Sequence, residues 1–157
     1  MVTNMQLSEI IIKQNIVPAL KAKDKKSVLE ELAESIARQE HSVEKNALVK
    51  VLMEREQLGT TGIGDGVAIP HGKLSNIDQP LISFGRSKDG LDFDSMDGQP
   101  SYLFFLLVAP DNSSGIHLQV LAKIAKILKN NDFRNELMAA TSSEELYRTI
   151  IRTDQEL

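Results

Sequence analysis

Residues 56–72 have the sequence Glu-Gln-Leu-Gly-Thr-Thr-Gly-Ile-Gly-Asp-Gly-Val-Ala-Ile-Pro-His-Gly. The glycine-rich first part is typical of a tight turn, and the apolar residues 67–69 that follow it predict a short strand. Pro70 fixes its own backbone dihedral and is expected to end this strand, so that His71 stands directly behind a rigid element. Gly72 has no side chain and is expected to leave the imidazole uncovered. The segment therefore predicts a histidine that is presented for reaction.

A histidine followed by a glycine also occurs where a strand simply ends beside a turn, so this pair alone does not establish a reactive site. The longer string is more specific. It has an acidic residue at Glu56, an aliphatic residue and a glycine at Ile63 and Gly64, and then aliphatic, Ala, aliphatic, Pro, His and small over 67–72. This pattern closely resembles the active-site signature of the EIIA domains of the phosphoenolpyruvate-dependent phosphotransferase system, in their fructose/mannitol class. The stretch 55–74 is most similar to the nitrogen-regulatory branch of that family.

The resemblance covers almost the whole chain and implies a fold as well as a chemistry. The family fold is a small mixed sheet flanked by helices on both sides, and residues 1–157 are expected to form one such EIIA domain. In that family the histidine of the signature, here His71, accepts a phosphoryl group. A second histidine, here His117, lies close to it in space, and Arg55 matches a family arginine near the reactive histidine.

The composition excludes several other classes of function. At 157 residues, the chain is long enough for one domain with a real hydrophobic core. Its formal net charge of −4, without any block of Lys or Arg, does not indicate nucleic-acid binding, and the lack of cysteine excludes disulfides and thiol catalysis. The start of the chain lacks an export signal, and the longest apolar run, residues 102–110, is too short to span a bilayer. A cytoplasmic domain without direct membrane insertion is therefore expected.

Strands and helices alternate along the chain, which favours an α/β fold with a sheet covered by helices. Residues 16–20 predict a weakly marked first strand, and Ser27 with Glu30 forms a capping-box pattern at the start of a first helix. Residues 102–109 are nearly all apolar, as expected for a central strand covered on both faces. The other predicted elements are a helix over 43–54, strands over 67–69 and 81–85, turns at 89–90 and 97–98, a helix over 115–129 that buries Leu118, Leu121, Ile124, Ala125 and Leu128, and two short helices that start at Asp132 and at Thr141 and Ser142.

The three histidines differ in their expected roles. His41 lies in a polar connection between two predicted helices and is interpreted as a solvated surface residue. His117 falls in the first turn of the helix predicted over 115–129, where a partly exposed structural residue would also fit. A helix N-terminus stabilises a nearby phosphate and disfavours a protonated imidazole. Beside His71, as the resemblance implies, His117 would be a neutral hydrogen-bond partner of the phosphoryl group.

Arg55 and the backbone amides of the glycine turn are further candidates to bind phosphoryl oxygens. A guanidinium offers a planar fork of donors that suits phosphate. Arg55 also ends the second predicted helix, where a cation is favourable against the helix dipole without any functional role. The glycines Gly62, Gly64, Gly66 and Gly72 are predicted to form part of the phosphate site.

Two charged residues near the histidine leave more than one interpretation open. Asp65 departs from the amide that related sequences often carry at this position. A carboxylate there would repel an incoming phosphate unless it points away or orients Arg55 or an imidazole. Lys73 could steer an anionic donor, or it could be an ordinary solvated lysine.

Nucleotide binding and zinc binding fit the sequence less well. A nucleotide-binding loop uses glycines that open a helix, whereas these glycines lead into a strand that ends at His71. A zinc site on His71 and His117 lacks a further ligand at the usual spacing. No cofactor and no metal are therefore expected.

Two functions share the phosphorylation of His71, and the resemblance implies both. In each, His71 accepts phosphate from the phosphohistidine of a small HPr/NPr-type donor, and an unprotonated ring nitrogen needs no general base for this attack. In the first, the protein is nitrogen-regulatory, and its phosphorylation state controls which partner proteins bind. In the alternative, it is the soluble EIIA component of a fructose/mannitol-type transport system and passes phosphate to a cysteine of a separate EIIB domain. The likeness of residues 72–74 to the nitrogen branch favours the regulatory function.

Overall fold

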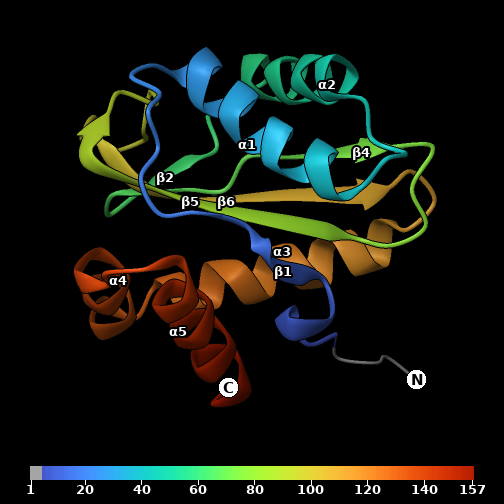
Figure 1. Ribbon diagram of the computed structural model, residues 1–157. Helices are drawn as coiled ribbons and strands as arrows, with labels where there is room; N and C mark the ends of the chain where they lie inside the picture. Colours follow the sequence, from blue (N-terminus) through green and yellow to red (C-terminus); the bar gives the residue numbers. More distant parts are fainter. Residues whose placement is uncertain (1–4) are drawn as a thin grey trace.

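A six-stranded sheet lies between two layers of helices in the computed structural model (Figure 1). The structure describes residues 5–157. Residues 1–4, which belong to the domain predicted from the sequence and to the start that is expected to lack an export signal, lie outside this range. The elements in chain order are η1 (Leu7–Glu9), β1 (Ile11–Val17), α1 (Lys25–Gln39), α2 (Lys45–Gln57), β2 (Gly62–Gly64), β3 (Val67–Ala68), β4 (His71–Leu74), β5 (Leu81–Leu91), β6 (Ser101–Pro110), α3 (Ser114–Leu128), α4 (Asn131–Ala139) and α5 (Ser143–Gln155).

The sheet is mixed, as predicted. Its strand order is β1-β5-β6-β3-β2, and β4 pairs with β6 farther along the same side. Strands β5 and β6 are antiparallel, whereas β1 is parallel to β5, and both β3 and β4 are parallel to β6. Strand β6 is therefore central, which confirms the interpretation of the apolar run over 102–109.

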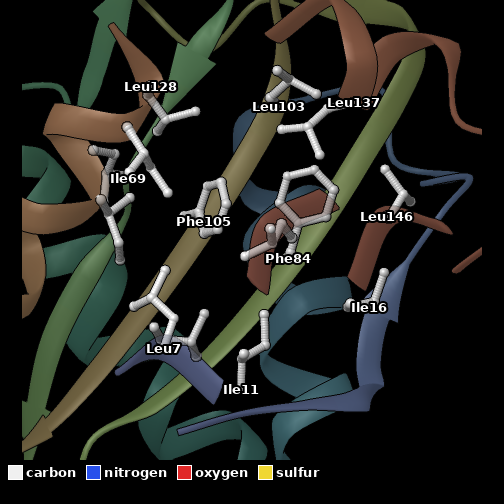
Figure 2. Packing of buried hydrophobic residues seen from close by; sticks show 14 of the residues in the cluster. Leu7, Ile11, Ile16, Ile69, Phe84, Leu103, Phe105, Leu128, Leu137 and Leu146 are labelled. Atoms are coloured by element: carbon white, nitrogen blue, oxygen red, sulfur yellow. The ribbon is translucent and has the colours of Figure 1, made fainter. Parts of the chain in front are cut away.

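Each face of the sheet has its own hydrophobic core. Helices α1 and α2 cover one face, and α3, α4 and α5 cover the other, together with η1 (Figure 1). Neighbouring residues of β6 alternate between the two cores, so that Phe104 packs under α1 and α2 while Phe105 packs against Phe84 on the α3 side (Figure 2). This alternation explains why a strand that is covered on both faces has a continuous apolar sequence.

The predicted start of the chain needs two corrections. The first strand is Ile11–Val17 and not 16–20, and its pairing with β5 is irregular between Ile11 and Ile16. This irregularity places several exposed residues in a row and hides the alternation that marks a strand. Helix α1 begins earlier than expected, because the side chain of Asp24 accepts a hydrogen bond from the backbone N–H of Ser27 at 2.8 Å. Asp24 is thus the N-cap residue in place of Ser27.

The later elements also depart from the prediction in places. The turn expected at 89–90 lies within β5, where Gly90 has a φ of 78° beside a shift in the pairing register. On α3, Leu118 was predicted to be buried but is 64% exposed, while His117 before it is buried. Helix α4 has its N-cap at Asn130, not at Asp132, whereas Ser142 caps α5 as predicted.

Candidate functional site

His71 begins a strand and does not follow the end of one, contrary to the sequence prediction. Val67 on β3 pairs with Leu103 and His71 on β4 pairs with Leu107, so the same register continues across the gap between the two strands. Pro70 lies in this gap, where it cannot donate a hydrogen bond, but its carbonyl accepts one from the N–H of Leu107 at 3.0 Å. Strands β3 and β4 thus run along β6 as one interrupted strand, which fixes the backbone of His71.

Side chains along this interrupted strand alternate between the two faces of the sheet. Ile69 points into the core on the α3 side (Figure 2), and His71, two residues later, faces the same side and meets His117 of α3. Gly72 faces α2 instead. A Cβ atom at Gly72 would lie 2.6 Å from Cγ1 of Val51, so glycine is required there for α2 to pack on β4. The sequence predicts that a glycine here serves to leave the imidazole uncovered. That reason is wrong, because the missing side chain makes room for α2.

The two ring nitrogens of His71 have different partners. Nδ1 lies 2.8 Å from the carbonyl oxygen of Ile69, and since a carbonyl can only accept, Nδ1 carries the proton. Arg55 donates its Nε–H to Nε2 at 3.3 Å, so Nε2 carries the lone pair. Burial lowers the pKa of His71 from its ordinary value of 6.5, against a smaller opposing effect of the bond to Ile69, and the charge of Arg55 lowers it further. At neutral pH, His71 is a neutral imidazole with a free lone pair on Nε2.

His117 stands beside this imidazole in the first turn of α3. The centroids of the two rings are 5.3 Å apart, and their planes are tilted by 55°. His117 is only 7% exposed, and within residues 5–157 its buried Nδ1 has no hydrogen-bond partner. Burial lowers the pKa of His117, and repulsion from His71 when that ring is protonated, together with the charge of Lys73, lowers it further. His117 is therefore neutral at neutral pH and can offer a hydrogen bond to a group on His71.

The two histidines lie at an open cavity of about 600 Å³ between the end of α2, the start of β4 and the start of α3. Lys73 is tethered there, because its Nζ donates to Oγ of Ser114 on α3 at 2.9 Å. The cavity is lined by Val51, Glu54, Arg55, Gln57, Leu58, His71, Gly72, Lys73 and His117. The structure thus brings together four of the predicted site residues, His71, His117, Arg55 and Gly72.

The other predicted glycines are not part of this cavity. Gly62 and Gly64 belong to β2, which pairs with β3, and Gly64 and Gly66 have φ values of 97° and 77° that favour glycine. Gly66 contacts β6 four residues before Leu107, the partner of His71, a separation on the order of 13 Å along the strand. Strand pairing and backbone conformation thus account for glycine at positions 62, 64 and 66. The geometry offers no support for a contact between these glycines and phosphate.

Asp65 lies outside the cavity of His71, which agrees with one of the alternatives that the sequence left open, a carboxylate turned away from the phosphate. It is exposed, does not line the cavity, and donates its backbone N–H to a carboxylate oxygen of Asp97 at 3.1 Å. Its φ is 56°, a left-handed conformation that Asp and Asn tolerate better than most residues. The backbone of the turn therefore accounts for an aspartate at this position.

A buried ionic contact that sequence analysis missed holds the segment before His71 in place. Glu56 is 8% exposed, and its Oε1 lies 3.0 Å from Nζ of Lys25 on α1. The backbone N–H of Thr61 donates to the same oxygen at 3.1 Å, and the Thr61 hydroxyl donates to the other one. This contact ties α1, α2 and the glycine turn together. The only hint of this contact in the sequence was the acidic residue at the first position of the signature, Glu56.

Two further properties concern the residues that the structure describes. Among residues 5–157, no group of three or more His, Cys, Asp or Glu side chains is placed to hold a metal ion. None of the helices in the same range is both long enough and apolar enough to cross a membrane.

Known proteins resemble this chain in fold and in sequence along most of its length. Residues 9–153 match the family model described as "Phosphoenolpyruvate-dependent sugar phosphotransferase system, EIIA 2". A nitrogen regulatory protein of Bradyrhizobium diazoefficiens is 41% identical over 146 residues, which cover 93% of this chain and 95% of that protein. The crystal structure of nitrogen regulatory protein IIA-Ntr from Neisseria meningitidis has a TM-score of 0.86 and 35% identity, and the match covers 92% of this chain and 98% of that one. The fructose-specific EIIABC component of Bacillus subtilis is 32% identical over 151 residues, which cover 96% of this chain but 24% of that protein.

Proposed function

Since this chain belongs to the EIIA type 2 family of the phosphoenolpyruvate-dependent sugar phosphotransferase system, we propose that it carries a phosphoryl group on Nε2 of His71. The donor is the phosphohistidine of a small HPr/NPr-type phosphocarrier. The observation that carries this proposal is the pair of contacts of His71. Nδ1–H is bound to the carbonyl of Ile69, and the lone pair on Nε2 is in contact with Arg55 at the cavity that His117 also lines.

The transfer needs little covalent chemistry from the protein. The lone pair of Nε2 forms a bond to phosphorus while the P–N bond of the donor breaks, and the donor nitrogen leaves with that electron pair. No proton has to leave His71, because its remaining proton stays on Nδ1 and in the bond to Ile69. The guanidinium of Arg55, whose Nε–H already faces Nε2, donates to the phosphoryl oxygens as the phosphoryl group arrives, and His117 donates a hydrogen bond to one of them. The first turn of α3 adds its partial positive charge.

Two exposed leucines flank the catalytic groups and form the contact surface for the donor in this proposal. Leu58 follows the end of α2 and is 85% exposed, and Leu118 follows His117 and is 64% exposed. Large exposed apolar side chains beside polar and charged groups are typical of a protein-binding site. A donor that presents an apolar rim around its phosphohistidine would cover both leucines and exclude water from the transfer.

Regulation through the phosphorylation state fits the comparisons best. Phosphorylation of His71 adds about two negative charges at the cavity, which is enough to change which protein binds there. The nitrogen regulatory protein of Bradyrhizobium diazoefficiens matches this chain over 95% of its own length, whereas the fructose-specific EIIABC component of Bacillus subtilis matches over 24% of its length. That second similarity supports the alternative function, in which His71 passes its phosphate to a cysteine of a separate EIIB domain.

The test is transfer of labelled phosphate from phosphoenolpyruvate, through enzyme I and an HPr- or NPr-type carrier, to the protein. We expect an acid-labile, base-stable label on the wild type and none on His71→Ala. Two-dimensional ¹⁵N–¹H and ³¹P spectra of the labelled protein should place the phosphorus on Nε2. A wild type that takes no label from either carrier would overturn the proposal, and rapid onward transfer to a fructose-type EIIB would favour the transport function.

A further inference from the structure

We propose that the backbone carbonyl of Gly59 positions the guanidinium of Arg55, which makes Gly59 a positioning residue for phosphoryl transfer at His71. The inference rests on the proposed function and deepens it. Gly59 lies outside the positions that match the active-site signature, and it follows the C-terminal end of α2 in the connection to β2.

The guanidinium of Arg55 joins two acceptors. Its Nε–H donates to Nε2 of His71 at 3.3 Å, and its Nη1 donates to the carbonyl oxygen of Gly59 at 2.9 Å. Within the described residues, Arg55 takes part in no ion pair, so no carboxylate competes with these two contacts. The hydrogen bond to the Gly59 carbonyl thus sets the orientation of the guanidinium relative to His71.

This arrangement leaves the Nε–Nη2 edge of the guanidinium facing Nε2 of His71. A guanidinium is planar, and Nε and Nη2 share the edge that lies away from Nη1. When Nη1 is held by Gly59, rotation of the plane is restricted and the Nε–Nη2 edge faces the atom that receives the phosphoryl group. Donors that are oriented before the reaction stabilise developing charge without reorganising, whereas a mobile arginine would lose that advantage.

The direction of the Gly59 carbonyl depends on a backbone conformation that favours glycine. Gly59 has a φ of 150°, which L side chains rarely adopt, and an added Cβ would meet no atom within 4 Å. A substitution there would therefore act through the backbone and not through a clash. The N–H of Gly59 donates to the carbonyl of Glu56 at 3.1 Å, so a changed φ would also turn the peptide group away from the end of α2.

Gly98 provides a matched control. It also has a positive φ, 72°, it is exposed, and an added Cβ would again meet no atom within 4 Å. It lies in the turn between β5 and β6 and does not line the cavity of His71. Gly98→Ala therefore also places an alanine at a positive φ, at a site without a link to Arg55.

The experiment compares Gly59→Ala with Gly98→Ala, Arg55→Gln and the double variant Gly59→Ala/Arg55→Gln, in two measurements. The first is an NMR titration of the His71 ring in the unphosphorylated protein, which requires no donor. Because the charge of Arg55 lowers the pKa of His71, we expect Gly59→Ala to raise this pKa toward its value in Arg55→Gln.

The second measurement is the rate constant of phosphoryl transfer from an HPr-type donor. We expect Gly59→Ala to lower it about tenfold, Gly98→Ala to change it less than about twofold, and Gly59→Ala to add no loss in the Arg55→Gln background.

A further variant, Arg55→Lys, keeps the positive charge but offers a point charge in place of the planar fork. We expect it to lose most of the transfer rate. The proposal is overturned if Arg55→Lys transfers at the wild-type rate, if Gly59→Ala behaves like Gly98→Ala, or if Gly59→Ala slows transfer without moving the His71 pKa. A wild type that takes no phosphate would remove the proposed function, while the titration would still decide whether Gly59 positions Arg55.

Discussion

His71 is prepared for its reaction by two ordinary effects, burial and one backbone hydrogen bond. Burial keeps the ring neutral, and the Ile69 carbonyl directs the remaining proton to Nδ1. Neither effect requires a charged partner or a general base. A short strand segment between two helices is therefore enough to keep the ring neutral with its lone pair on Nε2, which is the form that the proposed transfer requires.

The pKa values of both site histidines should lie below 6.5 in the folded protein, because burial is the largest influence on each. Since the neutral ring is the nucleophile, acceptance of phosphate should fall as the pH drops through the lowered pKa of His71. The unfolded chain binds protons at higher pH than the folded one, so stability should also fall on acidification from about 6.5. An NMR titration of the ring protons measures both midpoints. Midpoints at or above 6.5 would contradict this account of the site.

His117→Ala should slow transfer to His71 by on the order of a hundredfold without abolishing it, because it removes one donor to the phosphoryl oxygens and leaves the nucleophile intact. Rapid-quench measurement of labelled phosphate gives the rate. His41→Ala, an exposed residue in the α1–α2 connection, serves as the control and should transfer normally. If His117→Ala lost all label while His71→Ala kept it, the roles of the two histidines would be reversed.

At the level of elements, the reactive strand is held by the close approach of α2. Gly72→Ala should destabilise the domain by about 1–3 kcal/mol, because its Cβ would overlap Cγ1 of Val51 at 2.6 Å. Urea unfolding measures the change. The double variant Gly72→Ala/Val51→Ala should recover part of this loss, since the smaller residue on α2 makes room. If the double variant showed the sum of the two single effects, the clash would not be the cause.

The elements also show what the sequence could and could not predict. The run over 102–109 was recognised as a central strand because apolar side chains on both faces leave a local signal. The reason for Gly72 was missed, since its contact with Val51 joins segments that are distant in sequence. The burial of His117 and the exposure of Leu118 depend on how α3 is rotated against the sheet, which the sequence of one helix does not determine.

The site prediction was limited in the same way. A short, specific string was enough to single out His71, and the resemblance supplied Arg55 and His117, which the structure places beside it. The turn glycines Gly62, Gly64 and Gly66 lie close to His71 in sequence and yet outside its cavity. The chain reverses in the β2–β3 hairpin before it reaches the reactive strand, so closeness in sequence does not become closeness in space.

At the scale of the whole molecule, the cavity of His71 opens where the end of α2 and the starts of β4 and α3 meet; Leu58 lines this opening, and Leu118 is the exposed residue after His117. Leu58→Ser/Leu118→Ser should raise the KM for an HPr-type donor by about 30-fold to several hundredfold, because each leucine buried at the contact contributes about 1–2 kcal/mol and the two together about 2–4 kcal/mol. The transfer rate at saturating donor should change little, since neither leucine lies between phosphorus and Nε2.

Steady-state transfer from labelled donor over a range of donor concentrations separates the two effects. Ile12→Ser is the matched control, because Ile12 is also an exposed apolar residue but lies on β1, at the opposite edge of the sheet. Phosphoramidate, a small donor that needs no protein contact, should phosphorylate the double leucine variant as fast as the wild type. An unchanged KM for the protein donor would show that it docks elsewhere. A slower reaction with phosphoramidate would show that the leucines support the cavity itself and do not form a docking surface.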